Sequence, residues 1–102
     1  MRKSLLLLLL LVSISSLAQG NLLRGFVYEK DGGAAIPFAN ILIEGTQVGG
    51  TTNLDGYFQL ADVPQGMRQV TVSFLGYEPT TVEVKVFKNK PTTLKVFLEE
   101  SV

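Results

Sequence analysis

The sequence predicts an all-β fold, a seven-stranded antiparallel Greek-key β-sandwich, and three observations support this prediction. From Leu22 onward, apolar and polar residues alternate with a period of two, which indicates strands with one packed and one solvated face. β-Branched residues dominate the alternating runs, as strands prefer. Turn-forming residues interrupt the runs at short intervals, which is typical of sandwiches and barrels.

Turn sequences separate the strands one from the next. Lys30–Gly33, Asn53–Gly56 and Val63–Gly66 carry the Asp, Asn, Pro and Gly residues that tight turns prefer. Glycines at 45, 49 and 50 break the stretch between the first two of these turns. The clearest strands are expected at Leu22–Glu29, Phe38–Glu44, Tyr57–Ala61, 69–74, 81–86 and 93–99. The expected core is the inward set Ile41, Ile43, Phe58, Leu60, Val70, Val72, Phe74, Val82, Val84, Val86, Leu94, Val96 and Leu98.

The first 18 residues have the features of a secretory signal peptide. A basic pair at positions 2 and 3 precedes an apolar run from Leu5 to Val12, and the small residues Ser16 and Ala18 follow. This run is shorter than the roughly 20 residues that a membrane span needs, which disfavours an anchor or a buried core helix. We expect a helical signal peptide, residues 1–18, cleaved after Ala18, and one domain, residues 19–102, without a membrane span.

Composition narrows the classes of function. The 84 residues after the leader hold seven basic and nine acidic side chains, so no surface for nucleic acid or anionic lipid is expected. The chain contains neither Cys nor His. A lipoprotein anchor, a zinc site of the usual kind and a Ser-His or Cys-His nucleophile pair are therefore excluded. We expect no catalytic residue, no cofactor and no metal, and modest stability because disulfides are absent.

The order of the short motifs is more specific than the fold class. The motifs run Gly25-Phe26-Val27-Tyr28, Asp31-Gly32, Ile36–Ile43, Glu44-Gly45-Thr46, Gly50–Asn53, Asp55–Phe58, Val63–Gly66 and Val72–Tyr77. In this order they resemble the carboxypeptidase-regulatory-like domain, a transthyretin-like (prealbumin-like) β-sandwich. The resemblance is closest to the form that follows the signal peptide in SusC-like, TonB-dependent outer-membrane receptors of Bacteroidetes-type bacteria. It covers about Leu22 to Leu98, and Phe38 stands where the family pattern often has Gly.

This resemblance implies a non-catalytic accessory N-terminal domain of an outer-membrane nutrient receptor, located in the periplasm or at the outer membrane. The implied partners are the plug and barrel of the receptor or other envelope proteins. In the receptors a TonB-box segment, a plug and a long β-barrel follow this domain, whereas this sequence stops at Val102, so we expect a fragment or a truncated form. The alternative is a stand-alone periplasmic or secreted module that binds protein or carbohydrate. A third interpretation, an accessory domain of a metallocarboxypeptidase, is disfavoured because the chain contains no part of that enzyme.

Two groups of oxygen-bearing residues are candidate sites. Thr51, Asn53 and Asp55 before Gly56 partly match an oxygen-rich calcium loop, but one carboxylate is too few for that site. An Asx-type turn, in which Asn53 and Asp55 bond the local backbone, is the favoured interpretation. A glycoside hydrolase needs two carboxyls across a cleft, for which a domain this small has little room. The carboxylates considered for that chemistry are Glu29, Asp31, Glu44, Asp62, Glu83, Glu99 and Glu100.

Aromatic side chains are the third candidate. Tyr57, Tyr77, Phe87 and Phe97 are expected on outer faces or at strand ends. There they would form a platform that contacts a glycan or a protein partner. The favoured interpretation is that they cap the ends of the sandwich.

Overall fold

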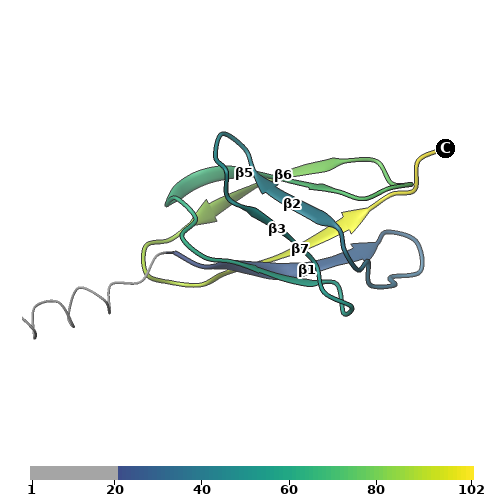
Figure 1. Cartoon of the computed structure of the whole chain (residues 1–102), viewed down its shortest axis with the longest axis horizontal. Helices are drawn as coiled ribbons and strands as arrows, with labels where there is room; N and C mark the ends of the chain where they lie inside the picture. Colours follow the sequence, from purple (N-terminus) through teal and green to yellow (C-terminus); the bar gives the residue numbers. More distant parts are fainter. Residues whose placement is uncertain (1–20) are drawn as a thin grey trace, which may run out of the picture.

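The computed structural model of the protein describes residues 21–102 and contains two β-sheets packed face to face (Figure 1). The three-stranded sheet has the order β4-β1-β7 and is formed by β1 (Leu23–Glu29), β4 (Tyr57–Leu60) and β7 (Thr92–Leu98). The four-stranded sheet has the order β3-β2-β5-β6 and is formed by β2 (Asn40–Ile43), β3 (Gly49–Thr51), β5 (Gly66–Ser73) and β6 (Thr80–Val86).

These two sheets confirm the predicted all-β sandwich of seven strands. Within residues 21–102 there is no helix with the length and apolar content needed to cross a membrane. The expected signal peptide, residues 1–18, lies outside the described residues and stays a prediction.

One strand pair differs from the antiparallel arrangement that the sequence predicts. β1 and β7 run parallel along their whole length, from Leu23 opposite Thr92 to Glu29 opposite Leu98. Parallel neighbours cannot be joined by a hairpin and need a long crossover, which the five intervening strands supply. All other pairs are antiparallel. β2 and β5 are neighbours although β3 and β4 separate them in the chain, as expected for Greek-key connectivity.

The β1–β7 pair depends on a glycine. Gly25 is buried in the middle of β1, opposite Leu94 of β7 and Phe58 of β4. A Cβ atom at position 25 would overlap the carbonyl oxygen of Leu94 and lie 3.1 Å from the ring of Phe58. The close approach of the three strands therefore requires glycine at this position.

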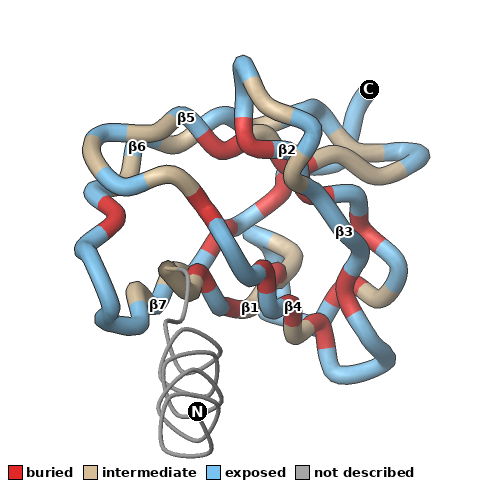
Figure 2. Tube along the Cα trace, turned by 60° about the vertical axis from the view of Figure 1, so that its left-hand side comes forward, coloured by how far each residue is buried: buried red, intermediate tan, exposed pale blue. Residues whose placement is uncertain are grey.

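The core fills the space between the two sheets, where the buried stretches in Figure 2 face one another. Nine predicted core residues are buried as expected: Ile41, Ile43, Phe58, Leu60, Val70, Val72, Val86, Val96 and Leu98. Four others, predicted to be core, are only partly buried: Phe74, Val82, Val84 and Leu94. Phe74 lies beyond the end of β5, and the other three lie on the edge strands β6 and β7, whose outer flank has no neighbour in the sheet. The prediction missed Leu23, Val27, Ile36, Ala39 and Val63, which complete the core.

Thr52 is the one buried polar side chain among the described residues. Its hydroxyl donates a hydrogen bond to the carbonyl of Ile36 at 2.7 Å and accepts one from the backbone N–H of Ala39 at 2.9 Å. The backbone N–H of Thr52 donates to the carbonyl of Ala39 at 3.0 Å. These three bonds fasten the segment before β2 to the segment that follows β3.

Phe38, in the segment held by Thr52, has a backbone φ of 61°. This left-handed conformation is unfavourable for a bulky residue, because the Cβ atom crowds the following carbonyl oxygen. Glycine adopts this conformation without that cost. The Phe38 ring is 59% exposed, so burial gives little compensation.

We expect Phe38→Gly to leave the free energy of unfolding unchanged or to raise it by up to about 1 kcal/mol, because relief of strain outweighs the greater freedom of the unfolded chain. Phe38→Val is the matched control and should lower it by about 1 kcal/mol, because β-branched residues tolerate positive φ poorly. Urea denaturation measures both. A loss of more than about 1 kcal/mol in Phe38→Gly would show that the ring makes a stabilising contact.

Thr52→Val should lower the free energy of unfolding by about 1–3 kcal/mol, because it leaves the N–H of Ala39 and the carbonyl of Ile36 short of a partner in the interior. The neighbouring Thr51→Val on the exposed face of β3 is the control, with an expected change within about 0.5 kcal/mol. The same denaturation measurement compares them. Equal effects of the two substitutions would contradict the role given to the Thr52 hydroxyl.

Candidate binding face

The proposed calcium loop is an Asx turn, as the favoured interpretation predicted. The Asn53 side-chain oxygen accepts hydrogen bonds from the backbone N–H groups of Asp55 at 2.9 Å and Tyr57 at 3.0 Å. The Asp55 side chain makes no hydrogen bond within the described residues, so its expected bond to the backbone was a wrong prediction. No three Asp or Glu side chains of residues 21–102 gather in a way that could hold a metal ion.

This turn also places the start of β4 against β1. Gly56 has a φ of 75°, and its carbonyl accepts a hydrogen bond from the backbone N–H of Val27 at 2.8 Å. An added Cβ at Gly56 would lie 2.7 Å from the carbonyl oxygen of Val27. Because the turn is fixed to β1, the next residue, Tyr57, comes to lie directly opposite Phe26.

Four aromatic rings form a continuous row across the outer face of the three-stranded sheet. Tyr57 of β4 contacts Phe26 of β1 with ring centroids 5.1 Å apart. Phe26 stacks on Tyr28 of the same strand, with centroids 5.8 Å apart and an angle of 9° between the planes. Tyr28 contacts Phe97 of β7 at 5.9 Å. The row therefore crosses all three strands.

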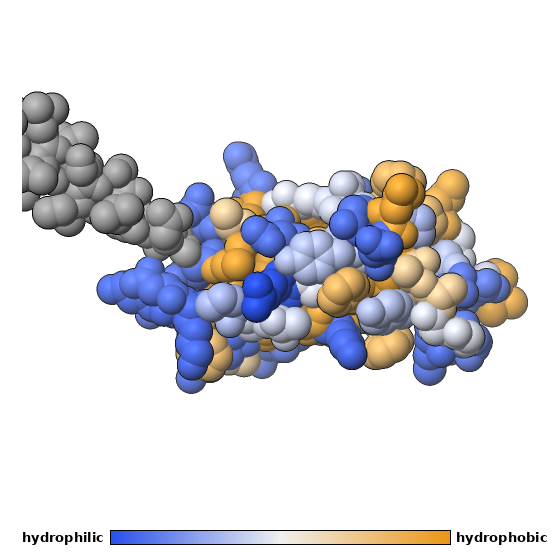
Figure 3. Space-filling view, turned by 90° about the horizontal axis from the view of Figure 1, so that it is seen from below, coloured by the Kyte–Doolittle hydropathy of each residue, from blue (hydrophilic) through white to orange (hydrophobic). Residues whose placement is uncertain are grey.

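Basic and polar side chains flank this row on the same face. Lys95 lies opposite Phe26, and Arg24 lies between Gln59 of β4 and Thr93 of β7 in the strand register. The Arg24 guanidinium donates to the Thr93 hydroxyl at 3.4 Å. We call these eight residues the aromatic–cationic face: Arg24, Phe26, Tyr28, Tyr57, Gln59, Thr93, Lys95 and Phe97. Figure 3 views this side of the molecule and shows apolar and near-neutral groups interspersed with strongly hydrophilic ones.

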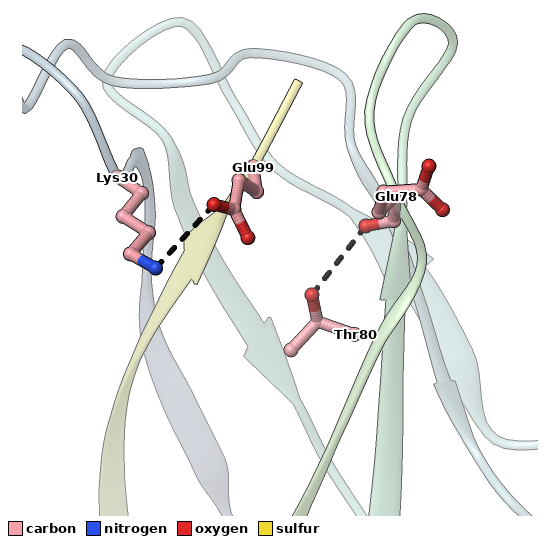
Figure 4. Close-up of polar contacts among 4 residues, drawn as sticks. All are labelled: Lys30, Glu78, Thr80 and Glu99. Atoms are coloured by element: carbon pink, nitrogen blue, oxygen red, sulfur yellow. Dashed lines mark hydrogen bonds and ion pairs between the residues drawn. The ribbon is translucent and has the colours of Figure 1, made fainter. Parts of the chain in front are cut away.

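Neither cation of the aromatic–cationic face has a carboxylate partner. The single ion pair within residues 21–102 joins Lys30 to Glu99 at 3.4 Å, just beyond the ends of β1 and β7 (Figure 4). Residues 1–20 contain no Asp or Glu. The charges of Arg24 and Lys95 are therefore not neutralised by an ion pair with any Asp or Glu side chain of the chain.

The outer face of the four-stranded sheet is different. Its central strands carry Asn40, Gln69, Thr71 and Ser73 together with the exposed aliphatic residues Leu42 and Met67, but no aromatic ring. The Thr71 hydroxyl bonds to that of Thr81 at 2.9 Å. Thr71 also donates to Glu44 at 2.7 Å. Aromatic rings in mutual contact are confined to the opposite sheet and to the end of the sandwich.

The other two aromatic residues proposed from the sequence lie elsewhere. Tyr77 packs on Phe74 at 6.0 Å and caps the end of the sandwich, as the favoured interpretation predicted. Phe87 lies beneath the ammonium groups of Lys85 and Lys90, 5.4 and 5.5 Å from its centroid. Tyr57 and Phe97 belong to the aromatic row rather than to an end cap, so the capping interpretation was wrong for these two.

Sequence reasoning missed Phe26 and Tyr28, the central pair of the row. The alternation in the first strand contained the signal, because Leu23 and Val27 are inward and residues at even positions must then point outward.

The Tyr77 cap includes a hydrogen bond to a carboxylate. The Tyr77 hydroxyl donates to the carboxylate of Glu29, and this bond, together with partial burial and the negative charges of Glu29 and Glu100, raises the pKa of Tyr77 to about 12. Next to it, the backbone N–H of Ser101 donates to the carbonyl of Gly76 at 3.0 Å. The segment after β7 is thereby held against the β5–β6 connection.

Three of the seven carboxylates considered for hydrolysis have polar partners, each a different one. Glu29 bonds to Tyr77, Glu44 accepts from Thr71, and Glu99 pairs with Lys30. Asp31, Asp62, Glu83 and Glu100 are exposed. Glu29, Glu44 and Glu99 therefore each have a structural role in a hydrogen bond or an ion pair.

Comparison with known proteins identifies relatives of the whole described domain. The profile of the CarboxypepD_reg-like domain family matches residues 23–102. TonB-dependent receptor SusC of Bacteroides thetaiotaomicron is 37% identical over 91 residues, which cover 87% of this chain and 9% of the receptor. TonB-dependent receptor P39 of Formosa agariphila is 32% identical over 96 residues, which cover 89% of this chain and 9% of the receptor. The chain thus spans about a tenth of the length of these relatives.

Solved structures resemble the chain in fold alone. A chain of a type II cohesin–X-dockerin complex from Acetivibrio cellulolyticus superposes with a TM-score of 0.67 at 19% identity, covering 79% of this chain and 58% of that one. The major pilin subunit BcpA of Bacillus cereus gives a TM-score of 0.58 at 14% identity, covering 78% of this chain and 30% of the pilin. Both likenesses agree with the β-sandwich architecture.

Tyr77 should ionise with a midpoint near pH 12. Because its folded pKa exceeds the ordinary value of 10.0, its contribution to stability is complete below pH 10 and is lost as the pH rises through 12. Titration of tyrosinate absorbance measures this. Tyr77→Phe should remove the step near pH 12, and Glu29→Gln should move that step to lower pH. A curve unchanged at high pH in Tyr77→Phe would contradict the assignment.

Proposed function

Since the chain belongs to the CarboxypepD_reg-like domain family, we propose that it is a non-catalytic accessory N-terminal domain of a TonB-dependent, SusC-like outer-membrane nutrient receptor. In this proposal the signal peptide directs export, and the domain folds in the periplasm ahead of the plug. It assists import through contacts with the plug, the barrel or other envelope proteins.

The proposal rests on the identity of the relatives to which the chain is similar. Both curated relatives are TonB-dependent receptors, and in both the similarity spans almost this entire domain but a small part of the receptor. A folded module shared with such receptors is expected to act as a part of them. The non-catalytic role is supported by the structural bonds that several candidate polar residues make. These are the Asx turn at Asn53, the hydrogen bond from Tyr77 to Glu29 and the ion pair of Lys30 with Glu99.

The strand arrangement suits an accessory domain placed in line between two segments of a longer chain. Because β1 and β7 are parallel, the chain enters the sandwich at one end and leaves it at the other, as Figure 1 shows. The seven residues of each strand separate these ends by roughly 23 Å. The bond from Ser101 to Gly76 fixes the direction in which the chain leaves. The domain would therefore act as a rigid spacer rather than a side branch.

A second candidate function, a stand-alone periplasmic or secreted binding module, is favoured by one observation. The aromatic–cationic face lies on the solvent side of its sheet and has half-buried and exposed aromatic rings beside unpaired cations, which suit a ligand. This function does not need the rest of a receptor.

The genomic reading frame distinguishes the two proposals. If the domain is part of a receptor, the frame that encodes residues 1–102 is expected to continue into a plug and a β-barrel. Sequencing the DNA on both sides of the coding region tests this. A stop codon directly after Val102, followed by unrelated genes, would contradict the receptor proposal and favour the stand-alone module.

A further inference from the structure

We propose that the aromatic–cationic face binds an acidic polysaccharide, with sugar rings packed over the aromatic row and carboxylates paired with Arg24 and Lys95. This binding would hold whether the domain is attached to a receptor or not. The binding experiment can therefore contradict this proposal without contradicting the receptor proposal, and the reading-frame test can contradict the receptor proposal without contradicting this one.

The first argument is the position of the rings. The solvent face of a two-layer sandwich normally carries mostly polar side chains. On the outer face of β2 and β5, polar residues are interspersed with two exposed aliphatic ones, Leu42 and Met67. On the opposite sheet, Tyr57, Phe26, Tyr28 and Phe97 instead form a connected row, and Phe97 is 51% exposed. The other three rings are half-buried. Aromatic surface gathered in one patch on a solvent face marks a binding surface.

The second argument is charge. Residues 21–102 contain seven basic and nine acidic side chains, so the described part of the chain is negative as a whole. Arg24 and Lys95 nevertheless lie on this face without a carboxylate within ion-pair distance. The potential near the aromatic row is therefore locally positive, which selects an anionic ligand by charge complementarity.

The third argument concerns the shape of the ligand. A peptide strand is recognised through the open edge of a sheet, which here is the outer flank of β4 or β7. The aromatic row instead lies on the face of the sheet and is centred on β1, which is bonded to a strand on each side. The groups available at the centre of the face are ring surfaces, the Gln59 amide, the Thr93 hydroxyl and two cations. A pyranose ring offers C–H groups on its faces and hydroxyls at its rim, which match ring surfaces and polar side chains respectively. A carboxylate on each sugar would match the cations.

The test is isothermal titration calorimetry, in which polygalacturonate is added to residues 19–102, the chain expected after signal-peptide cleavage. Highly methyl-esterified polygalacturonate has the same backbone with its carboxylates masked and is the matched ligand control. Polyglutamate is the control for an acidic peptide. We expect measurable binding to polygalacturonate, weakened by added salt, and at least about tenfold weaker binding to each control.

Substitutions distinguish binding at the aromatic–cationic face from nonspecific electrostatic attraction to the protein. The double variant Arg24→Gln/Lys95→Gln should bind about tenfold more weakly, whereas Lys88→Gln in the β6–β7 turn should bind unchanged. Phe97→Ala should weaken binding about tenfold, whereas Phe87→Ala, in the connection between β6 and β7, should not. Circular dichroism confirms that each variant is folded, and Phe97 and Lys95 are exposed enough for substitution to be tolerated.

Four results would each overturn the proposal. They are no binding at millimolar uronate, equal binding to the esterified polymer or to polyglutamate, full binding by Arg24→Gln/Lys95→Gln, and full binding by Phe97→Ala. The last would show that charge alone attracts the polymer and that the aromatic row takes no part.

Discussion

The parallel pairing of β1 with β7 is the constraint on which the rest of the structure depends. β1 is the central strand of its sheet, so its alternation sets which side chains of three strands face the core and which face solvent. Leu23 and Val27 point inward and are fully buried. Phe26 and Tyr28 then point outward, where β4 and β7 add Tyr57 and Phe97 to them. The pairing of β1 with β4 and β7 therefore determines both the packed core and the aromatic–cationic face. Gly25 permits this pairing because it allows β7 to approach β1 closely.

Local patterns predicted the strands and much of the core. Inward residues such as Ile41, Ile43, Val70 and Val72 follow from alternation, because β2 and β5 lie inside the sheet where parity decides burial. The direction of β1 relative to β7 could not be predicted in this way, because their pairing joins the two ends of the chain. Alternation also cannot tell an edge strand from a central one, so the partial burial of Val82 and Val84 on β6 was not foreseen.

The candidate site was only partly predicted, because it also depends on which strands become neighbours. Tyr57 and Phe97 were expected on outer faces or at strand ends, with end caps favoured, because a row exists only when strands distant in sequence become neighbours. The Asx turn at Asn53 was predictable because its hydrogen bonds span four residues at most. The Thr52 hydroxyl, whose bonds reach 13 and 16 residues away, gave no signal in the sequence.

The same pairing links fold to function, because it decides where the chain enters and leaves the domain. The most direct test is the distance between spin labels on cysteines introduced by Leu22→Cys and Ser101→Cys, which are specific because the chain has no native Cys. Double electron–electron resonance should give a separation of at least about 20 Å, the length of the parallel strands. A separation below about 10 Å would require β1 and β7 to run antiparallel and would contradict the account.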